Sequence, residues 1–187
     1  MAHTRRLSAF SLAVACATLL CAAVTTSHAS PTVAQIKAEL KKCRAVVEKN
    51  MPYKAYLQII DELLKLNNAY TMGLANTTLL IPTNKGLYSL GLKTLTNVTA
   101  MIVIIEYNVL AKRFTYAQLA NVAAGAKLKT VLPRVPIKVF EKSQGKVVLG
   151  TPGSAANAVG MVIKPDMCTG VFVKGHGMSR YFKPPGY

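Results

Sequence analysis

Residues able to perform acid-base chemistry are scarce in this chain of 187 residues. Two of the three histidines, His3 and His28, lie near the N-terminus, which leaves His176 for the body of the chain. Gly175 and Gly177 flank His176, a setting that suits a tight turn better than a general base. No Gly-x-Ser-x-Gly elbow surrounds a serine, and no glycine-rich phosphate loop occurs. We therefore expect neither a catalytic residue nor a cofactor.

The seven acidic residues give no support for paired-carboxylate or metal chemistry. Only Asp61 and Glu62 are adjacent, and on a helix such neighbours point about 100° apart. After the first 29 residues the chain holds two cysteines and one histidine. These cannot complete a four-ligand zinc site without a carboxylate or a partner chain. The expectation is a protein that is not an enzyme and has no metal site.

The first 29 residues have the pattern of a secretory signal peptide. Arg5 and Arg6 supply a positive start, residues 7–24 carry no charge, and Ser27-His28-Ala29 fits a small-x-small cleavage site. An uncleaved membrane anchor is the alternative, because the apolar stretch approaches the roughly 17 residues that can span a bilayer. We predict a signal peptide over residues 1–29 and one secreted domain over residues 30–187.

Cys43 and Cys168 are the two cysteines of the predicted secreted domain. An even pair in an oxidising compartment suggests a disulfide, and two unrelated buried thiols are the alternative. Two acceptor sequons, beginning at Asn76 and Asn97, predict N-glycosylation in a secreted chain.

The charge of the domain is strongly positive. Residues 30–187 hold 21 basic and seven acidic side chains, a net charge of +14, and the 51% apolar content of the whole chain is too high for a disordered protein. Residues 112–146 contain eight basic residues and a single acid, Glu141. We predict that the eight basic residues bind a polyanion: Lys112, Arg113, Lys127, Lys129, Arg134, Lys138, Lys142 and Lys146.

An extracellular acidic polysaccharide or matrix glycoprotein is the expected partner. Charge dispersed for solubility is the alternative. Nucleic acid is not expected, because the chain is predicted to be secreted and lacks a basic motif interleaved with aromatics.

Helical spacing dominates the first part of the domain. Apolar residues Ile36, Leu40, Cys43 and Val47 place one inward stripe on a predicted helix over residues 33–49. Further helices are predicted over residues 55–67, 85–90, 94–107 and 115–122, and residues 94–107 are apolar enough to be buried on most sides.

Strand patterns dominate the second part. Strands are predicted over residues 76–81, 127–132, 137–140, 146–149, 158–164 and 170–173, with residues 137–140 and 146–149 forming a hairpin. Helices mainly in the N-terminal half and strands mainly in the C-terminal half, without a βαβ rhythm, predict an α+β fold.

Four motifs occur in an order that resembles the fasciclin domain of secreted and cell-surface adhesion proteins. Residues 78–90, with Pro82 and Thr83, look like its first box, and residues 106–115, with Tyr107 and Asn108, like its central Tyr-His stretch. Residues 129–132 look like its Thr-Leu strand. Residues 162–167, together with residues 176–184 that begin at His176, look like its second box. The resemblance covers residues 34–184 and implies one fasciclin-like domain.

Two departures from the family pattern bear on function. Asn108 stands where many members carry the His of the Tyr-His pair, which has been connected with cell adhesion in animal members, and Tyr181-Phe182 replaces two aliphatics. A single module with a signal peptide looks most like small secreted fasciclin-like proteins of plants. The resemblance implies a secreted glycoprotein of the extracellular matrix or cell wall that acts in adhesion or binds anionic polysaccharide. The alternative is a cationic defence protein that attacks anionic membranes with the helix at residues 33–49.

Overall fold

Helix α1 (Val33–Glu48) opens the part of the chain that this computed structural model describes, residues 30–91, 97–153 and 159–186. Thr32 starts the helix with a capping box, in which its hydroxyl accepts the N–H of Gln35 and the Gln35 side chain accepts the N–H of Thr32. The predicted stripe is confirmed: its members are at most 3% exposed, namely Ile36, Leu40, Cys43 and Val47.

The remaining helices are short, and one differs from its prediction. They are η1 (Met51–Tyr56), α2 (Leu57–Lys65), α3 (Asn68–Gly73), α4 (Asn84–Tyr88), α6 (Val98–Tyr107) and α7 (Tyr116–Ala120). The helix predicted over residues 55–67 is wrong at both ends, because a 3-10 turn that contains Pro52 precedes α2 and Asn67 caps the separate helix α3. Among the described residues, none of the helices has the length and hydropathy needed to cross a membrane.

Seven strands form one mixed sheet. They are β1 (Thr77–Pro82), β2 (Val109–Leu110), β3 (Lys127–Leu128), β4 (Ile137–Val139), β5 (Val148–Gly150), β6 (Gly160–Thr169) and β7 (Val173–Met178). Their order is β2-β1-β7-β6-β5-β4-β3, with β1 parallel to β7 and the other pairs antiparallel. A bridge between Leu110 and Thr130 links the two edges, so the sheet nearly closes into a barrel. The predicted hairpin is confirmed as the β4–β5 pair.

The end of the chain corrects two predictions. The strand predicted over residues 170–173 is wrong, since β6 runs to Thr169 and β7 begins only at Val173. His176 therefore lies within a strand, and the tight turn predicted around it is wrong as well. Its two glycines serve close packing instead. A Cβ on Gly175 would lie 3.0 Å from the Cβ of Cys168, and one on Gly177 would lie 2.6 Å from the Tyr53 hydroxyl.

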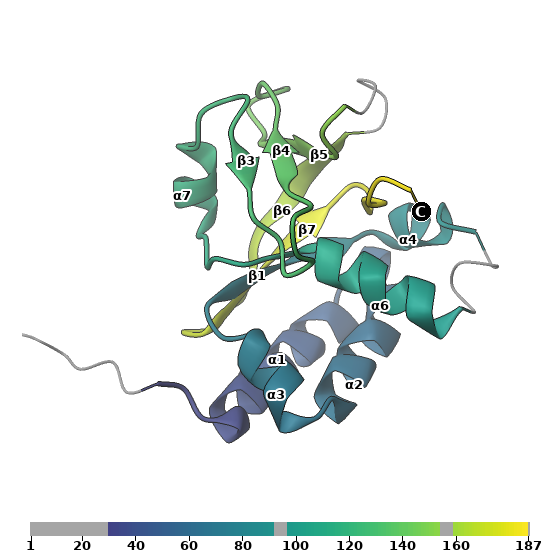
Figure 1. Cartoon of the computed structure of the whole chain (residues 1–187), viewed down its shortest axis with the longest axis vertical. Helices are drawn as coiled ribbons and strands as arrows, with labels where there is room; N and C mark the ends of the chain where they lie inside the picture. Colours follow the sequence, from purple (N-terminus) through teal and green to yellow (C-terminus); the bar gives the residue numbers. More distant parts are fainter. Residues whose placement is uncertain (1–29, 92–96, 154–158, 187) are drawn as a thin grey trace, which may run out of the picture. The chain divides into compact units, whose positions relative to one another are not determined.

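The strands β1, β6 and β7 separate two apolar cores. Leu79 and Ile81 of β1 pack with the inward stripes of α1 and α2, whereas Leu80 between them packs inside the barrel with Leu149 and Met178. Figure 1 shows α1, α2 and α3 on one side of these strands and α7 with β3, β4 and β5 on the other. Residues 31–187 cluster as one compact unit, and the predicted α+β class is confirmed. The predicted signal peptide lies outside the described residues.

Candidate functional site

The Tyr107-Asn108 pair is buried where α6 ends, at 0% and 1% exposure. The Tyr107 hydroxyl lies 3.2 Å from the carbonyl oxygen of Pro136 and 3.1 Å from the hydroxyl of Thr151, and burial raises the pKa of Tyr107 above its ordinary value. The Asn108 amide donates to the carbonyls of Ile104 and Phe182 at 2.8 Å each, and its oxygen accepts the Phe182 N–H at 3.0 Å. Asn108 thus fastens the C-terminal segment to α6, and neither side chain of the pair can meet a partner.

His176 is also a structural tie rather than an exposed functional group. It is 0% exposed, and its Nδ1 accepts the N–H of Asp166 at 3.0 Å while its Nε2 lies 3.0 Å from the carbonyl oxygen of Phe114. These partners require the neutral ring with the proton on Nε2. Burial lowers the pKa of His176, outweighing the carbonyl of Phe114 and the Asp166 carboxylate, which favour the charged form. His176 therefore joins β7 to the bend in β6 and to the segment before α7.

The other family-motif residues join β1 to the C-terminal half. Pro82 is buried and ends the parallel pairing with β7, opposite Met178. Thr83 caps α4 by accepting the Gly86 N–H and also donates its hydroxyl to the carbonyl of Ser179, 96 residues away in the sequence. The structure therefore places every family-motif residue in a role that holds the fold together.

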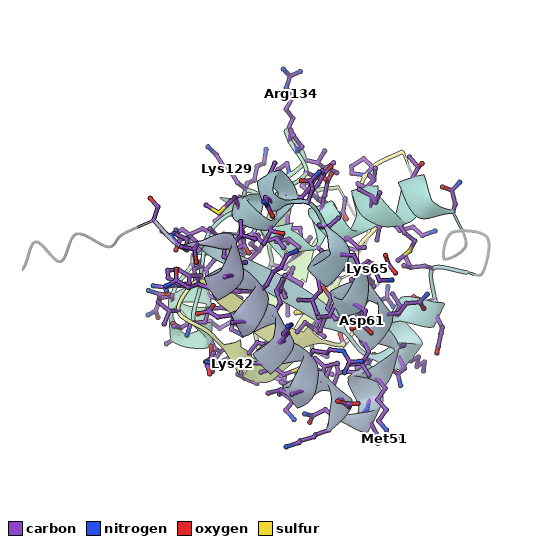
Figure 2. The ribbon with its side chains drawn as sticks, turned by 90° about the horizontal axis from the view of Figure 1, so that it is seen from below. Lys42, Met51, Asp61, Lys65, Lys129 and Arg134 are labelled. Carbon is purple, nitrogen blue, oxygen red and sulfur yellow. A yellow bond between two sulfur atoms is a disulfide. The ribbon has the colours of Figure 1, made fainter. Side chains whose placement is uncertain are left out.

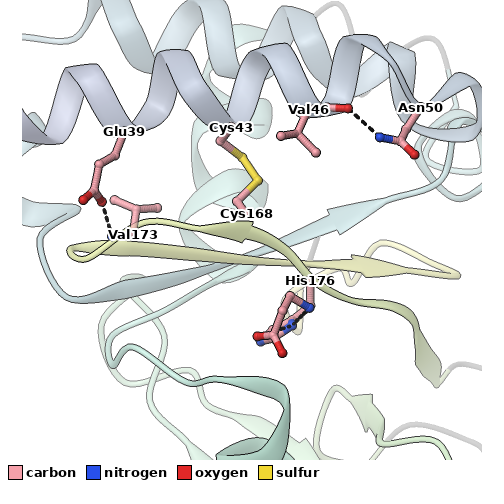
Figure 3. The surroundings of a disulfide bond; sticks show 8 residues. Glu39, Cys43, Val46, Asn50, Cys168, Val173 and His176 are labelled. Atoms are coloured by element: carbon pink, nitrogen blue, oxygen red, sulfur yellow. Dashed lines mark hydrogen bonds and ion pairs between the residues drawn. A yellow bond between two sulfur atoms is a disulfide. The ribbon is translucent and has the colours of Figure 1, made fainter.

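The predicted disulfide is confirmed and fixes α1 against the sheet. Cys43 and Cys168 are bonded, with Cα atoms 5.1 Å apart. Figure 3 shows the bond between α1 and β6, with His176 on the side of the strands away from α1. Because the apolar stripe of α1 is buried beside this bond, the folded chain does not offer that stripe to a membrane, contrary to what the defence hypothesis requires.

Glu39 forms a second attachment of α1 that the sequence pattern did not reveal. Its carboxylate accepts the N–H groups of Val171, Phe172 and Val173 at 2.7 to 2.8 Å, at the turn between β6 and β7 (Figure 3). A side chain on Gly170 would collide with this carboxylate. The only sequence signal was an isolated acid in a basic helix, and nothing local indicated a partner 132 or more residues away.

The predicted polyanion-binding residues are brought together only in part. Lys127 and Lys138 are direct cross-strand partners in β3 and β4, and Lys129 is exposed two residues after Lys127. Their inward neighbours, Leu128 and Ile137, fill the barrel, so the three lysines share its outer surface. We name Lys127, Lys129 and Lys138 the β3–β4 basic face.

The other five predicted basic residues lie around this face or beyond it. Lys112 stands beside it, because the neighbouring Ala111 donates its N–H to the carbonyl of Lys129. Arg113 follows Lys112, Arg134 occupies a turn after β3, and Lys142 and Lys146 belong to the β4–β5 connection. In Figure 2, Lys129 and Arg134 lie toward one edge, away from Lys42 and Lys65.

Both predicted glycosylation sites lie on the surface. Asn76 is exposed just before β1, and Asn97 is exposed at the start of α6. The Asn97 oxygen accepts the Ala100 N–H, which leaves its amide nitrogen, the atom a glycan would join, free of that bond. Neither position requires a glycan to enter the core.

Three carboxylates of α1 and α2 form ion pairs on the surface. Arg44 binds Asp61 at 2.6 Å and Glu48 at 3.3 Å, and Lys65 binds Glu62 at 2.8 Å. Across residues 30–91, 97–153 and 159–186, no three His, Cys, Asp or Glu side chains gather as metal ligands would.

Comparison with known proteins finds similar folds among solved structures. No protein-family model and no curated protein matches the chain. A solved structure with a similar fold is a FAS1 domain pair from the insect cell adhesion molecule fasciclin I, at 17% sequence identity and a TM-score of 0.49. The match covers 79% of this chain and 46% of that one, so the chain spans about half the length of the solved chain that it matches.

Proposed function

We propose that this chain is a secreted, fasciclin-like protein of the extracellular matrix or cell wall that acts by adhesion, without catalysis, through binding of an acidic polysaccharide. The observation that carries the proposal is the pairing of Lys127 with Lys138 across β3 and β4. Like charges directly opposite each other destabilise an antiparallel pair. A destabilising arrangement of this kind is expected at a functional site. A bound polyanion would relieve the repulsion between the two lysines.

The surroundings of this pair support the same reading. Lys138 lies with its ammonium 5.2 Å from the centre of the Phe140 ring, and Lys112 lies 5.4 Å from that of Phe114. Each ring holds its lysine by a cation–π contact, which limits the conformational entropy lost when an anion binds. Strands β3 and β4 contain no acidic residue. The β3–β4 basic face is therefore a partly organised cationic surface.

A polyuronate binding assay tests the proposal. We expect binding by residues 30–187 to fall steeply between about 0.02 and 0.5 M salt, because exposed charges are screened over roughly 10 Å already at 0.1 M. The double variant Lys127→Glu, Lys138→Glu should weaken binding at least about tenfold. Its control is Lys54→Glu, Lys85→Glu, which makes the same charge change at two exposed positions outside this face. Equal losses in both variants, or binding that ignores salt, would contradict the proposal.

Glycosylation at Asn76 and Asn97 belongs to the same proposal, because it requires passage through the secretory route. The natively secreted protein should shift to lower mass after amidase treatment. The variants Asn76→Gln and Asn97→Gln should each remove one step of that shift. An unchanged gel mobility of the untreated and treated protein would rule out both sites.

A further inference from the structure

An open apolar hollow lies between α2, α3 and α6. Its volume is about 490 Å³, within the range typical of small-molecule sites. Its walls are mainly aliphatic and include Leu63, Leu66, Leu74, Ile102, Ile105 and Val131. Ile102 is 41% exposed, so α6 is less completely buried than its apolar sequence predicts. Apolar side chains of α6, among them Ile102 and Ile105, therefore line a space that a ligand could fill.

The charges of this hollow oppose those of the rest of the protein. Its charged lining residues are both acids, Glu62 and Glu106, in a domain whose net charge is +14. Glu62 is already paired with Lys65 at 2.8 Å. Glu106 is half-buried and is hydrogen-bonded by the Tyr70 hydroxyl, and this bond together with the nearby negative charge raises the pKa of Tyr70. Glu106 therefore stands at an apolar wall with a neutral partner and no paired cation in the lining.

We infer that the hollow binds an amphiphilic organic cation, with its apolar body against the aliphatic wall and its ammonium group at the Glu106 carboxylate. The aliphatic wall supplies affinity by removing the ligand's apolar surface from water. Glu106 supplies selection by charge, because a half-buried carboxylate favours an ammonium group and repels a carboxylate of the same chain length. The inference is independent of the proposed polysaccharide site, since the hollow shares no residue with the β3–β4 basic face.

Three probes of equal chain length separate these contributions: dodecylammonium, dodecanol and dodecanoate, each titrated below its micelle concentration into residues 30–187. Binding is followed by calorimetry and by the methyl NMR signals of Ile102 and Ile105. We expect dodecylammonium to bind roughly fivefold or more tightly than dodecanol, with dodecanoate weakest. Glu106→Gln should remove the advantage of the ammonium probe and leave dodecanol unchanged. The control Glu48→Gln, an equal charge change outside the hollow, should alter neither.

A second variant tests the place of binding without removing a contact. Gly73 lines the hollow at the end of α3, and a Cβ built on it would meet nothing within 4 Å. Gly73→Leu should fill the space, weaken all three probes at least about tenfold, and leave the unfolding transition no lower than in the parent. Gly73→Ala should retain binding. The inference is overturned if dodecylammonium ignores both Gly73→Leu and Glu106→Gln, if dodecanoate binds as tightly, or if none of the probes binds.

Discussion

Replacement of Asn108 tests whether the central motif holds the fold or contacts a partner. In Asn108→Ala, the N–H and carbonyl of Phe182 would both lose their partner, and Phe182 is 2% exposed. The carbonyl of Ile104 would keep its backbone bond from the N–H of residue 108. Two buried polar groups left unpaired, at about 1 to 3 kcal/mol each, predict a loss of roughly 4 kcal/mol in the free energy of unfolding. That is a large fraction of the 5 to 15 kcal/mol typical of a domain.

Histidine, which many fasciclin domains carry at the position of Asn108, should destabilise the fold less than alanine. In Asn108→His, a neutral imidazole has one donor and one acceptor, so it can replace two of the three hydrogen bonds that Asn108 makes. We expect a loss of about 1 to 2 kcal/mol, smaller than that of the alanine variant. Asn68→Ala serves as the control, because Asn68 is exposed at the start of α3.

Urea unfolding followed by far-UV circular dichroism measures these losses, and polyuronate binding is measured on the same samples under folding conditions. The chain has no tryptophan, so fluorescence is less useful. If the free energy of unfolding of Asn108→Ala lies within about 1 kcal/mol of the parent value, the Asn108 amide does not hold the C-terminal segment to α6. If the alanine variant stays folded but loses polyuronate binding, the motif contacts the partner and the structural explanation is wrong.

Three further predictions concern the disulfide, the buried histidine and the basic face. The double variant Cys43→Ala, Cys168→Ala should lose up to about 5 kcal/mol of unfolding free energy in urea, because the bond closes a loop across a separation of 125 residues; equal urea midpoints would refute a bond in the folded protein. His176 has a lowered pKa when folded, so its contribution to stability is complete above about pH 6.5 and declines as pH falls toward the folded pKa. Between pH 7.5 and 5 the parent should therefore lose stability more steeply than His176→Gln, and parallel curves would exclude this explanation. Lys127→Glu should raise the unfolding free energy by about 0.2 to 1 kcal/mol while weakening polyuronate binding, since it converts a repulsive pair with Lys138 into an attractive one; a lower thermal midpoint would contradict it.

Features that depend on local spacing could be predicted from the order of residues. Apolar spacing predicted both the α1 helix and its buried face, which carries Ile36, Leu40, Cys43 and Val47. A helix brings residues three and four apart onto one side whatever surrounds it. The β4–β5 hairpin followed from alternation on either side of a short turn. The α+β class followed in turn from the order of such local patterns.

Contacts between groups far apart in the chain could not be predicted and are known from the folded structure. The parallel pairing of β1 with β7 joins segments almost 100 residues apart, and it turned His176 from an expected turn residue into a buried strand residue. The contacts of Glu39 with the β6–β7 turn and of Asn108 with Phe182 have no local signal either. Strand pairing is selected by total burial and backbone hydrogen bonding across the whole chain, so a short window of sequence does not encode the partner.

The candidate sites divide in the same way. Composition alone indicated a basic domain. Only the fold places Lys127 opposite Lys138 in β3 and β4, with Lys129 on the same outer surface. The hollow beside Glu106 could not be predicted from the sequence, because its walls come from three helices, from β2 and from a segment beyond β3. Charge content is a property of the sequence, whereas the place where charge meets an apolar surface is a property of the packed fold.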